Sequence, residues 1–192
     1  MVKIFLIRHG ATEGNLQHRY IGTTDEALCP AGVKQIERLK PAVPAPDLIF
    51  SSPARRARES REILFPGREQ IIVPGLMETD FGIFENKTAE ELSECPEYAC
   101  WLESMCRGPI PGGESAAEFK KRACRAFTLA ADSIPDGQTA AFIVHGGVIM
   151  AVFEAFDSEK KDFYSYHMPN GSVAECEYYR NKIYIKKLYF CD

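Results

Sequence analysis

Two apolar runs that each end in histidine and glycine constrain the fold of this chain more than any other feature. The first, Ile4 to Ile7, is followed by Arg8-His9-Gly10, and the second, Ala140 to Val144, is followed by His145-Gly146. Uninterrupted apolar runs of this kind are typical of strands buried on both faces of a parallel sheet. Because glycine lets the backbone turn away sharply, each histidine can face a cavity beyond its strand.

Arg8-His9-Gly10 taken alone is equally typical of a strand that ends at the protein surface. The second His-Gly pair, more than a hundred residues later, favours a shared site. In an open parallel sheet, ligands bind in the crevice at the carboxyl ends of the strands. We therefore predict that His9 and His145 face one another in one crevice.

The remaining hydrophobic periodicity alternates between strands and helices. Helices are predicted up to about Lys40, from Pro53 to Leu64 with a serine cap, from a capping box at Ser115 to Ser133, and from Val148 to Phe156. Further strands are predicted at 48–50, 71–73, 173–179 and 183–190, the last two forming a hairpin around Arg180-Asn181-Lys182. This alternation indicates an α/β three-layer sandwich with a mostly parallel central sheet and helices on both faces.

Residues 79–111 break this pattern. Short helical pieces are predicted at about 88–94 and 96–105, without a strand between them. We expect a small helical lid inserted into one domain that spans residues 1–192. A chain of 192 residues with 45% hydrophobic content is long enough for one well-buried domain of this kind.

Composition disfavours several classes of partner. The chain carries 23 Lys and Arg against 27 Asp and Glu, a balance that argues against nucleic acid or an anionic membrane. Its apolar runs are shorter than the ~18 residues that span a bilayer. Arg8 and His9 interrupt the first apolar run too early for a signal peptide, so we expect a cytoplasmic protein.

The seven cysteines are predicted to be scattered, reduced thiols. They are odd in number and contain no Cys-x-x-Cys pair, and the spacing of 95, 100 and 106 is poor for zinc, which stays a minor alternative. No cofactor is expected. The seven are Cys29, Cys95, Cys100, Cys106, Cys124, Cys176 and Cys191.

Five segments in register resemble the histidine phosphatase superfamily, in the branch that contains cofactor-dependent phosphoglycerate mutases and related small phosphatases. Arg-His-Gly alone would be a weak signal, whereas five segments in order, covering nearly the whole chain, are specific. The segments are Arg8-His9-Gly10 with Thr12 and Asn15, Ser51 to Ala57, Leu76 to Gly82, Gly112 to Ser115, and Val144 to Gly147.

The resemblance implies a role for each matching side chain. His9 corresponds to the nucleophile, Arg56 and not Arg55 to the arginine that binds phosphate, Glu78 to the proton donor, and His145 to the second histidine, with Arg8 beside the nucleophile. The substrate is expected to contact Asn15, Thr12, Ile21, Gly22 and Gly146. A metal is not required.

The chemistry of these residue types agrees with those roles. A phosphoryl group in transfer spreads negative charge over its oxygens, which Arg8 and Arg56 can bind with fork-shaped hydrogen bonds. His9 must be neutral to attack phosphorus, and nearby arginines disfavour its protonated form. His145 is expected to donate to the phosphoryl group. Glu78 is expected to protonate the leaving oxygen and then to accept a proton from water.

Charge in residues 79–111 favours a phosphatase over a phosphoglycerate mutase. A mutase must hold a second phosphate and a carboxylate, but this segment carries two basic residues against seven acidic ones, a net charge of −5. Such a lid is expected to repel a polyanion and to accept a phosphomonoester whose other end is neutral or apolar. The basic residues are Lys87 and Arg107, and the acidic ones are Asp80, Glu85, Glu90, Glu91, Glu94, Glu97 and Glu103.

Among small phosphatases, the compact length and the segment from Leu76 to Gly82 are most similar to alpha-ribazole phosphatases of cobalamin assembly. The substrate is expected to be a small phosphorylated metabolite, such as alpha-ribazole 5'-phosphate. Two alternatives stay open: a cofactor-dependent phosphoglycerate mutase, and an inactive binding module of the same fold. The module requires loss of a catalytic side chain, and all five are present. His18 and His167 lie outside these segments and are predicted to be surface residues or to lie behind the residues that contact the substrate.

Overall fold

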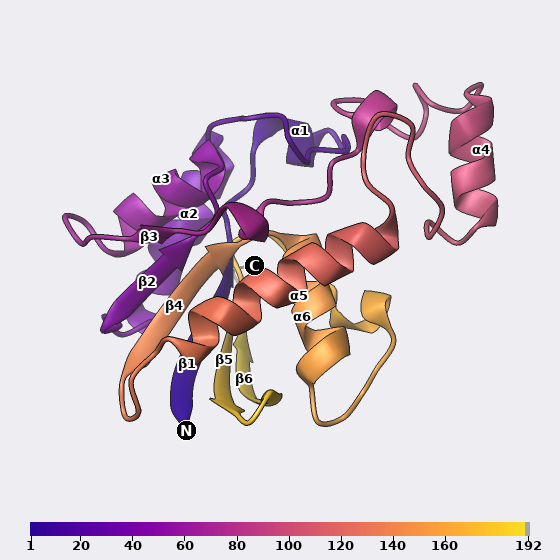
Figure 1. Ribbon diagram of the computed structural model, residues 1–192. Helices are drawn as coiled ribbons and strands as arrows, with labels where there is room; N and C mark the ends of the chain where they lie inside the picture. The colour runs from indigo at the N-terminus through magenta and orange to yellow at the C-terminus, as the bar shows by residue number, and fades with distance from the viewer. Residues whose placement is uncertain (191–192) are drawn as a thin grey trace.

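The computed structural model describes residues 1–190, so Cys191 lies outside the described residues. A six-stranded sheet in the order β3-β2-β4-β1-β5-β6 forms its centre (Figure 1). The first four of these strands run parallel, and the C-terminal hairpin β5–β6 is antiparallel. The strands are β1 (Val2–Arg8), β2 (Leu48–Ser51), β3 (Ile71–Ile72), β4 (Thr139–Val144), β5 (Val173–Tyr179) and β6 (Lys182–Tyr189).

Six α-helices connect and cover these strands. They are α1 (Glu13–Leu16), α2 (Pro30–Leu39), α3 (Arg55–Leu64), α4 (Pro96–Glu103), α5 (Ala116–Asp132) and α6 (Gly146–Phe156), all within residues 1–190. Short 3₁₀ turns lie at Lys40–Ala42, Pro74–Leu76, Gly82–Phe84 and Phe163–Tyr166. The predicted α/β class with a mostly parallel sheet is confirmed.

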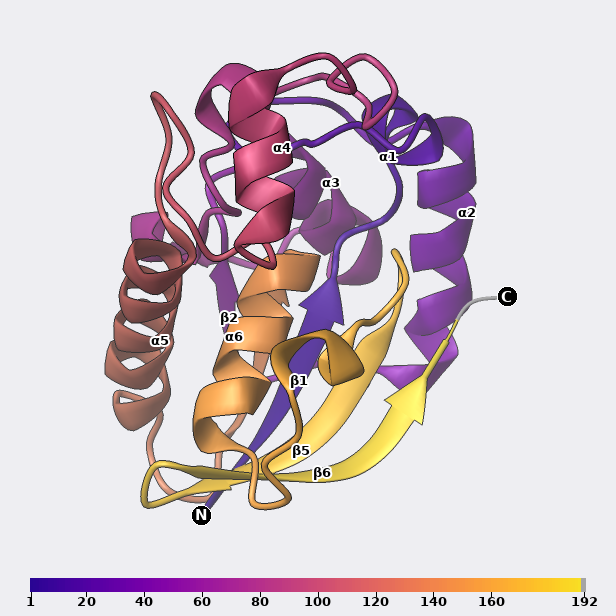
Figure 2. The same ribbon diagram turned by 90° about the vertical axis from the view of Figure 1, so that its right-hand side faces the viewer.

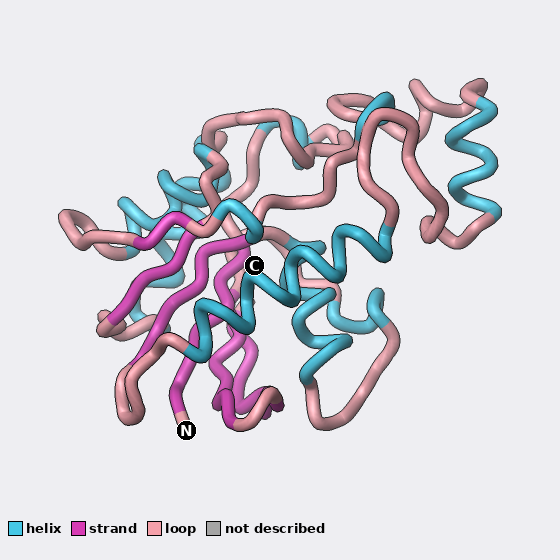
Figure 3. Tube along the Cα trace, viewed as in Figure 1, coloured by secondary structure: helices cyan, strands magenta, loops and turns pink. Residues whose placement is uncertain are grey.

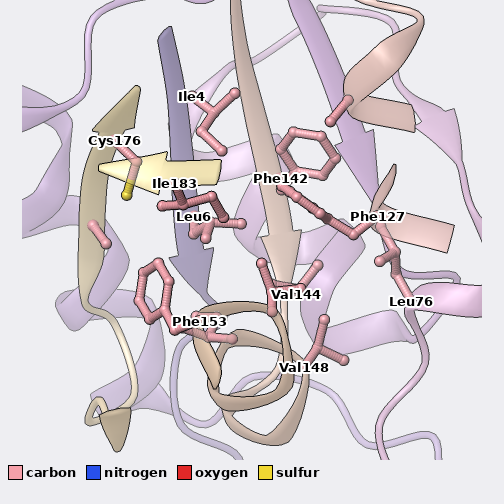
Figure 4. Packing of buried hydrophobic residues seen from close by; sticks show 14 of the residues in the cluster. Ile4, Leu6, Leu76, Phe127, Phe142, Val144, Val148, Phe153, Cys176 and Ile183 are labelled. Carbon is pink, nitrogen blue, oxygen red and sulfur yellow. The ribbon is translucent and has the colours of Figure 1, made fainter. Parts of the chain in front are cut away.

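Two hydrophobic layers hold the sheet between helices (Figure 2). Helices α5 and α6 pack on the face that carries Ile4 and Leu6, and α2 and α3 pack on the face that carries Phe5 and Ile7. Figure 4 shows the first layer, where Phe127 of α5 meets Phe142 of β4 at 5.1 Å between ring centroids. Because β1 is covered on both faces, its sequence is apolar without alternation.

The start of α3 differs from the prediction. The helix begins at Arg55 rather than Pro53, its N-cap is Ala54, and it has no side-chain cap. Ser52 lies before the N-cap, where its hydroxyl accepts from the amide of Ala54 at 3.3 Å and contacts His145, as described below. By contrast, Ser115 and Glu118 form both hydrogen bonds of the predicted capping box of α5.

Residues 79–111, called the 79–111 segment below, lie beyond the carboxyl ends of the parallel strands (Figures 1 and 3). Only one of the two predicted helical pieces forms a helix, α4, and 88–94 form turns instead. The two ends of the segment touch, since the amide of Ile83 donates to the carbonyl of Pro111 at 3.0 Å. A Cβ at Gly82 would lie 2.2 Å from that carbonyl oxygen, so only glycine permits this approach.

Candidate active site

The sheet brings the two predicted histidines together. β1 and β4 are adjacent parallel strands in which Arg8 pairs with Val144, so His9 and His145 follow at the same level. Their ring centroids lie 5.0 Å apart, with 67° between the ring planes. His9 is 3% exposed and His145 is fully buried. The two side chains therefore lie together at the carboxyl ends of the strands.

Hydrogen bonds determine which nitrogen of His9 carries its proton. Nδ1 lies 2.7 Å from the carbonyl oxygen of Gly10, which can only accept, so Nδ1 is the protonated nitrogen. Nε2 lies 3.3 Å from Nε of Arg56, which can only donate. The Nε2 lone pair therefore accepts from Arg56 and is directed at its guanidinium group.

The surroundings of His9 keep its imidazole neutral. Burial is the largest cause and places the pKa of His9 well below 6.5, and the positive charges of Arg56 and Arg8 lower it further. The hydrogen bond to the carbonyl of Gly10 opposes these effects without reversing them. The prediction named the arginines as the reason for neutrality, whereas desolvation contributes more.

Arg56 is buried beside the nucleophile candidate, as the resemblance implies. Its Nη1 donates to the carbonyl of Thr24 at 2.9 Å and its Nη2 to the carbonyl of Gly22 at 2.9 Å. These two bonds hold the guanidinium with Nε toward His9. Arg55, the next residue on α3, points to solvent and pairs with Glu59.

The Arg8 side chain is held by the loop that contains His167 and Met168. Its Nη1 donates to the carbonyl of Met168 and lies 3.5 Å from Nε2 of His167. Its Nε is buried and has no partner among residues 1–190. A Cβ at Gly146 would lie 3.0 Å from the guanidinium carbon, so this glycine makes room for Arg8 at the start of α6.

His145 is held through one ring nitrogen. Nε2 lies 2.7 Å from the hydroxyl of Ser52, while Nδ1 is buried without a partner in the described part of the chain. Burial, followed by the charge of Arg56, places its pKa well below 6.5. A neutral ring that accepts from the Ser52 hydroxyl at Nε2 would carry its proton on Nδ1 and could donate it to an anion.

The carboxylate of Glu78 lies against the first turn of α6. Its carboxylate accepts from the amide of Thr79 at 2.9 Å and from the amide of Gly147 at 2.8 Å. A Cβ at Gly147 would lie 2.3 Å from Oε1 of Glu78. Arg122 holds the loop before it by donating to the carbonyls of Gly75, Met77 and Glu78.

The five predicted substrate-binding residues occupy different positions. Asn15, Ile21 and Gly146 line a pocket that opens beside the site and is described below, whereas Thr12 and Gly22 do not line it. Thr12 caps α1 by accepting from the amide of Asn15. The amide of Gly22 donates to the carboxylate of Glu85, and its carbonyl binds Arg56, so Gly22 supports the arginine and has no free N–H for a substrate.

A pocket of about 700 Å³ opens next to these groups. The 79–111 segment supplies Phe81, Trp101, Met105 and Ile110 to its wall, and Phe119, Met150, Phe163 and Tyr164 line it from the helical layer and the loop after α6. Two of its basic residues are neutralised, Arg19 by Glu91 and Lys120 by Glu154. The space beyond the arginines is therefore largely apolar and aromatic.

The prediction that acidic residues of the 79–111 segment repel a polyanion assumed that they face the substrate, and the structure does not place them there. Within residues 1–190, none of its seven acidic side chains lines the pocket, and Arg107 is its only charged residue that does. Glu85 accepts backbone amides of residues 22–24, Glu91 pairs with Arg19, and Asp80 accepts from Gly82. A count of charges could not show which way they face.

The structure adds four residues to the site that the sequence did not single out for it. Ser52 bonds to His145, Arg122 supports Glu78, Asn170 bonds to Asn15, and His167 lines the pocket beside Arg8. His18 and His167 are both exposed, as predicted, and His167 in addition borders the pocket. A polar residue in a turn, such as Asn170, carries no signal of a distant partner.

The parallel sheet thus brings two histidines and Arg8 to its strand ends, and α3 adds Arg56 beside them. The chain belongs to the histidine phosphatase superfamily (branch 1), whose model matches residues 4–190. The family resemblance of the five sequence segments is confirmed.

Three similar proteins carry different names. A protein of Hydrogenobacter thermophilus, provisionally named phosphoserine phosphatase 2, is 29% identical over 98% of this chain and 97% of its own. The adenosylcobalamin/alpha-ribazole phosphatase of Salmonella typhimurium is 30% identical over 77% and 76%. The crystal structure of phosphoglycerate mutase from Thermus thermophilus has a TM-score of 0.74 at 31% identity, covering 95% and 96%.

Proposed function

We propose that this protein is a metal-independent phosphomonoester hydrolase that acts through a phosphohistidine at His9. The observation that carries this proposal is the state of the His9 imidazole, which is buried, neutral and protonated on Nδ1, with its Nε2 lone pair beside Arg56. Two buried nitrogens have no partner in the described chain, Nε of Arg8 and Nδ1 of His145; the first is a donor for an anion, and so is the second in the tautomer that accepts from Ser52.

The proposed reaction has two steps. In the first, Nε2 of His9 forms a bond to phosphorus, the bond from phosphorus to the ester oxygen breaks, and Glu78 gives its proton to that oxygen. In the second, the Glu78 carboxylate takes a proton from water, the water oxygen bonds to phosphorus, and the N–P bond breaks to release phosphate. Arg8 and Arg56 bind the equatorial oxygens throughout.

The apolar wall of the pocket supports a substrate with an uncharged, ring-bearing alcohol part. Flat side chains such as Trp101, Phe81 and Tyr164 can bind a ring, and alpha-ribazole 5'-phosphate has this character. A phosphoglycerate mutase needs cations for a second phosphate and a carboxylate. Beyond Arg8 and His167, Arg107 is the one basic lining residue without an ion pair within residues 1–190, which supports hydrolysis over the mutase.

The test is hydrolysis of p-nitrophenyl phosphate in excess EDTA by wild type and by two matched pairs of variants. His9→Ala and Arg56→Ala should abolish turnover. His18→Ala and Arg55→Ala change the same residue types at exposed positions and should keep it. An acid-labile phosphoenzyme should form in wild type and be absent in His9→Ala.

A substrate panel then separates the alternatives. Alpha-ribazole 5'-phosphate should be preferred to phosphoserine and to 3-phosphoglycerate, and Trp101→Ala should reduce that preference by raising KM. Interconversion of phosphoglycerates that depends on bisphosphoglycerate would replace the phosphatase by the mutase. No turnover of any phosphomonoester, with no phosphoenzyme, would leave the inactive binding module.

We also propose that the 79–111 segment acts as a lid within a single domain, since it forms one wall of the pocket and has its own small core around Phe84 and Trp101.

Across residues 1–190, no helix combines the length and the apolar character needed to span a membrane. A small-molecule phosphomonoester as substrate and a cytoplasmic location remain predictions.

A further inference from the structure

We propose that Asn170 is a positioning residue for the phosphoryl site, because it sets the orientation of the Asn15 side-chain amide. This inference rests on the proposed function, in which Asn15 contacts the phosphoryl group. Asn170 lies in the loop before β5, more than 150 residues from Asn15 in sequence. Its Nδ2 donates to Oδ1 of Asn15 at 3.1 Å and to the backbone carbonyl of His9 at 3.3 Å.

The first step concerns the orientation of Asn170 itself. The carbonyl oxygen of His9 can only accept a hydrogen bond, so the atom of Asn170 that faces it must be the amide nitrogen. The neighbouring amide of Gly171 donates to the same carbonyl at 3.0 Å. The hydroxyl of Ser172 donates to the carbonyl of Pro169 at 2.6 Å, a bond that spans Asn170 without involving its side chain.

The second step transfers that orientation to Asn15. Two donors face the same atom of the Asn15 side chain, Nδ2 of Asn170 at 3.1 Å and the backbone amide of Thr12 at 3.2 Å. Only the side-chain oxygen can accept from both. The Nδ2 group of Asn15 therefore points away from these donors, and Asn15 lines the pocket.

The consequence is a neutral donor with a determined direction. The two hydrogens of Asn15 Nδ2 are left for an anion, because the amide forms no other hydrogen bond among residues 1–190. A flipped amide would place NH₂ against two donors and would turn an oxygen toward the phosphoryl oxygens, so it is disfavoured on both sides. Asn170 thus acts on the substrate through Asn15 without touching it.

Two substitutions at Asn170 test this with different severity. Asn170→Asp presents only acceptors, so the Asn15 amide should turn and direct its oxygen at the anion. Inhibition by orthovanadate and kcat/KM for p-nitrophenyl phosphate should weaken by about 10- to 100-fold, the size of one charge-assisted hydrogen bond. Asn170→Ala leaves the Thr12 amide as the remaining donor that orients Asn15 and should cost about 3- to 10-fold. The alanine variant still tests the proposal if Asn170→Asp does not fold.

Ser172→Ala is the matched control for a loosened loop. It removes the bond to Pro169 but leaves Asn170 and Asn15 paired, so orthovanadate inhibition should stay within about twofold of wild type. A purely structural role for Asn170 predicts equal losses in Ser172→Ala and Asn170→Ala, with matching losses of thermal stability. That result would overturn the proposal.

A double-mutant cycle with Asn15→Ala identifies the route of the effect. If Asn170 acts through Asn15, Asn170→Asp should weaken orthovanadate binding by less than about twofold in the Asn15→Ala background. An undiminished loss there would mean that the new charge repels the anion directly, and the positioning role would be rejected. Affinity for inorganic phosphate, measured by calorimetry on the same variants, needs no turnover. It therefore decides the role of Asn170 even if the wild type hydrolyses nothing and the proposed function fails.

Discussion

The two buried histidines should make the stability of this protein depend strongly on pH. Both have a pKa well below 6.5 in the folded state, chiefly because of burial. In the unfolded chain, a histidine takes up its proton near about pH 6.5. Between these values only the unfolded state binds the proton, so the free energy of unfolding falls as the pH falls below about 6.5.

The size of the loss follows from linkage. Between about pH 7 and about pH 5.5, a histidine that stays neutral when folded loses about 1.2 kcal/mol of stability, from ~1.36 kcal/mol per pH unit. Two such residues lose about 2.5 kcal/mol, an upper value because it neglects protonation of the folded state. This is a substantial part of a typical stability of about 5–15 kcal/mol.

Urea unfolding at the two pH values measures this loss in wild type, His9→Gln, His145→Gln and the double variant. Each single variant should lose about 1.2 kcal/mol less than wild type on acidification, and the double variant about 2.5 kcal/mol less. Other titrating groups cancel in these differences. His18→Gln replaces an exposed histidine and controls for the substitution itself. Equal losses in wild type and in the double variant would refute the assignment of both rings as neutral.

Three further predictions concern single contacts. In Gly147→Ala, the new Cβ would lie 2.3 Å from Oε1 of Glu78 and would therefore displace the carboxylate. Hydrolysis of an alkyl phosphate should fall at least ~10-fold, whereas that of p-nitrophenyl phosphate should fall less because its leaving group needs little protonation. Equal losses would contradict an acid role for Glu78. Ser52→Ala removes the partner of His145 Nε2 and should slow phosphoenzyme formation, followed by rapid quench, by about 10-fold; an unchanged rate would show that Ser52 does not orient the ring. Phe127→Ala should lower the free energy of unfolding by about 3–5 kcal/mol in urea while kcat of the folded enzyme stays within about twofold; a parallel loss of kcat would show that the core positions the site.

The sequence allowed prediction of the strands and of the residues at their ends, for a physical reason. A strand buried on both faces must be apolar throughout, and a glycine after its terminal histidine lets the backbone turn so that the imidazole faces a crevice. Sequence could not show that β4 lies between β1 and β2, and this order is what brings His145 to His9. The resemblance to a family singled out Arg56 and Glu78, because hydrophobic periodicity alone does not distinguish these two charged residues from charged residues at the surface.

The residues that sequence analysis missed act through long-range contacts. Ser52 looks like a helix cap from its neighbours, yet its hydroxyl is engaged by His145, more than 90 residues away. Asn170 is typical of a turn residue, and its role depends on a partner at the other end of the chain. The acidic residues of the 79–111 segment were counted correctly, but the backbone amides and the arginine that bind Asp80, Glu85 and Glu91 orient these side chains, and a net charge carries no direction.

The separation of the two imidazoles, 5.0 Å between centroids, is close to the ~4.8 Å between neighbouring strands. Both histidines follow a hydrogen-bonded register, Arg8 with Val144, that any side chains compatible with a strand can form. The spacing of the two imidazoles is thus determined by the peptide backbone. Core side chains can therefore change, and with them the stability of the fold, without altering this spacing, provided that the β1–β4 register is kept.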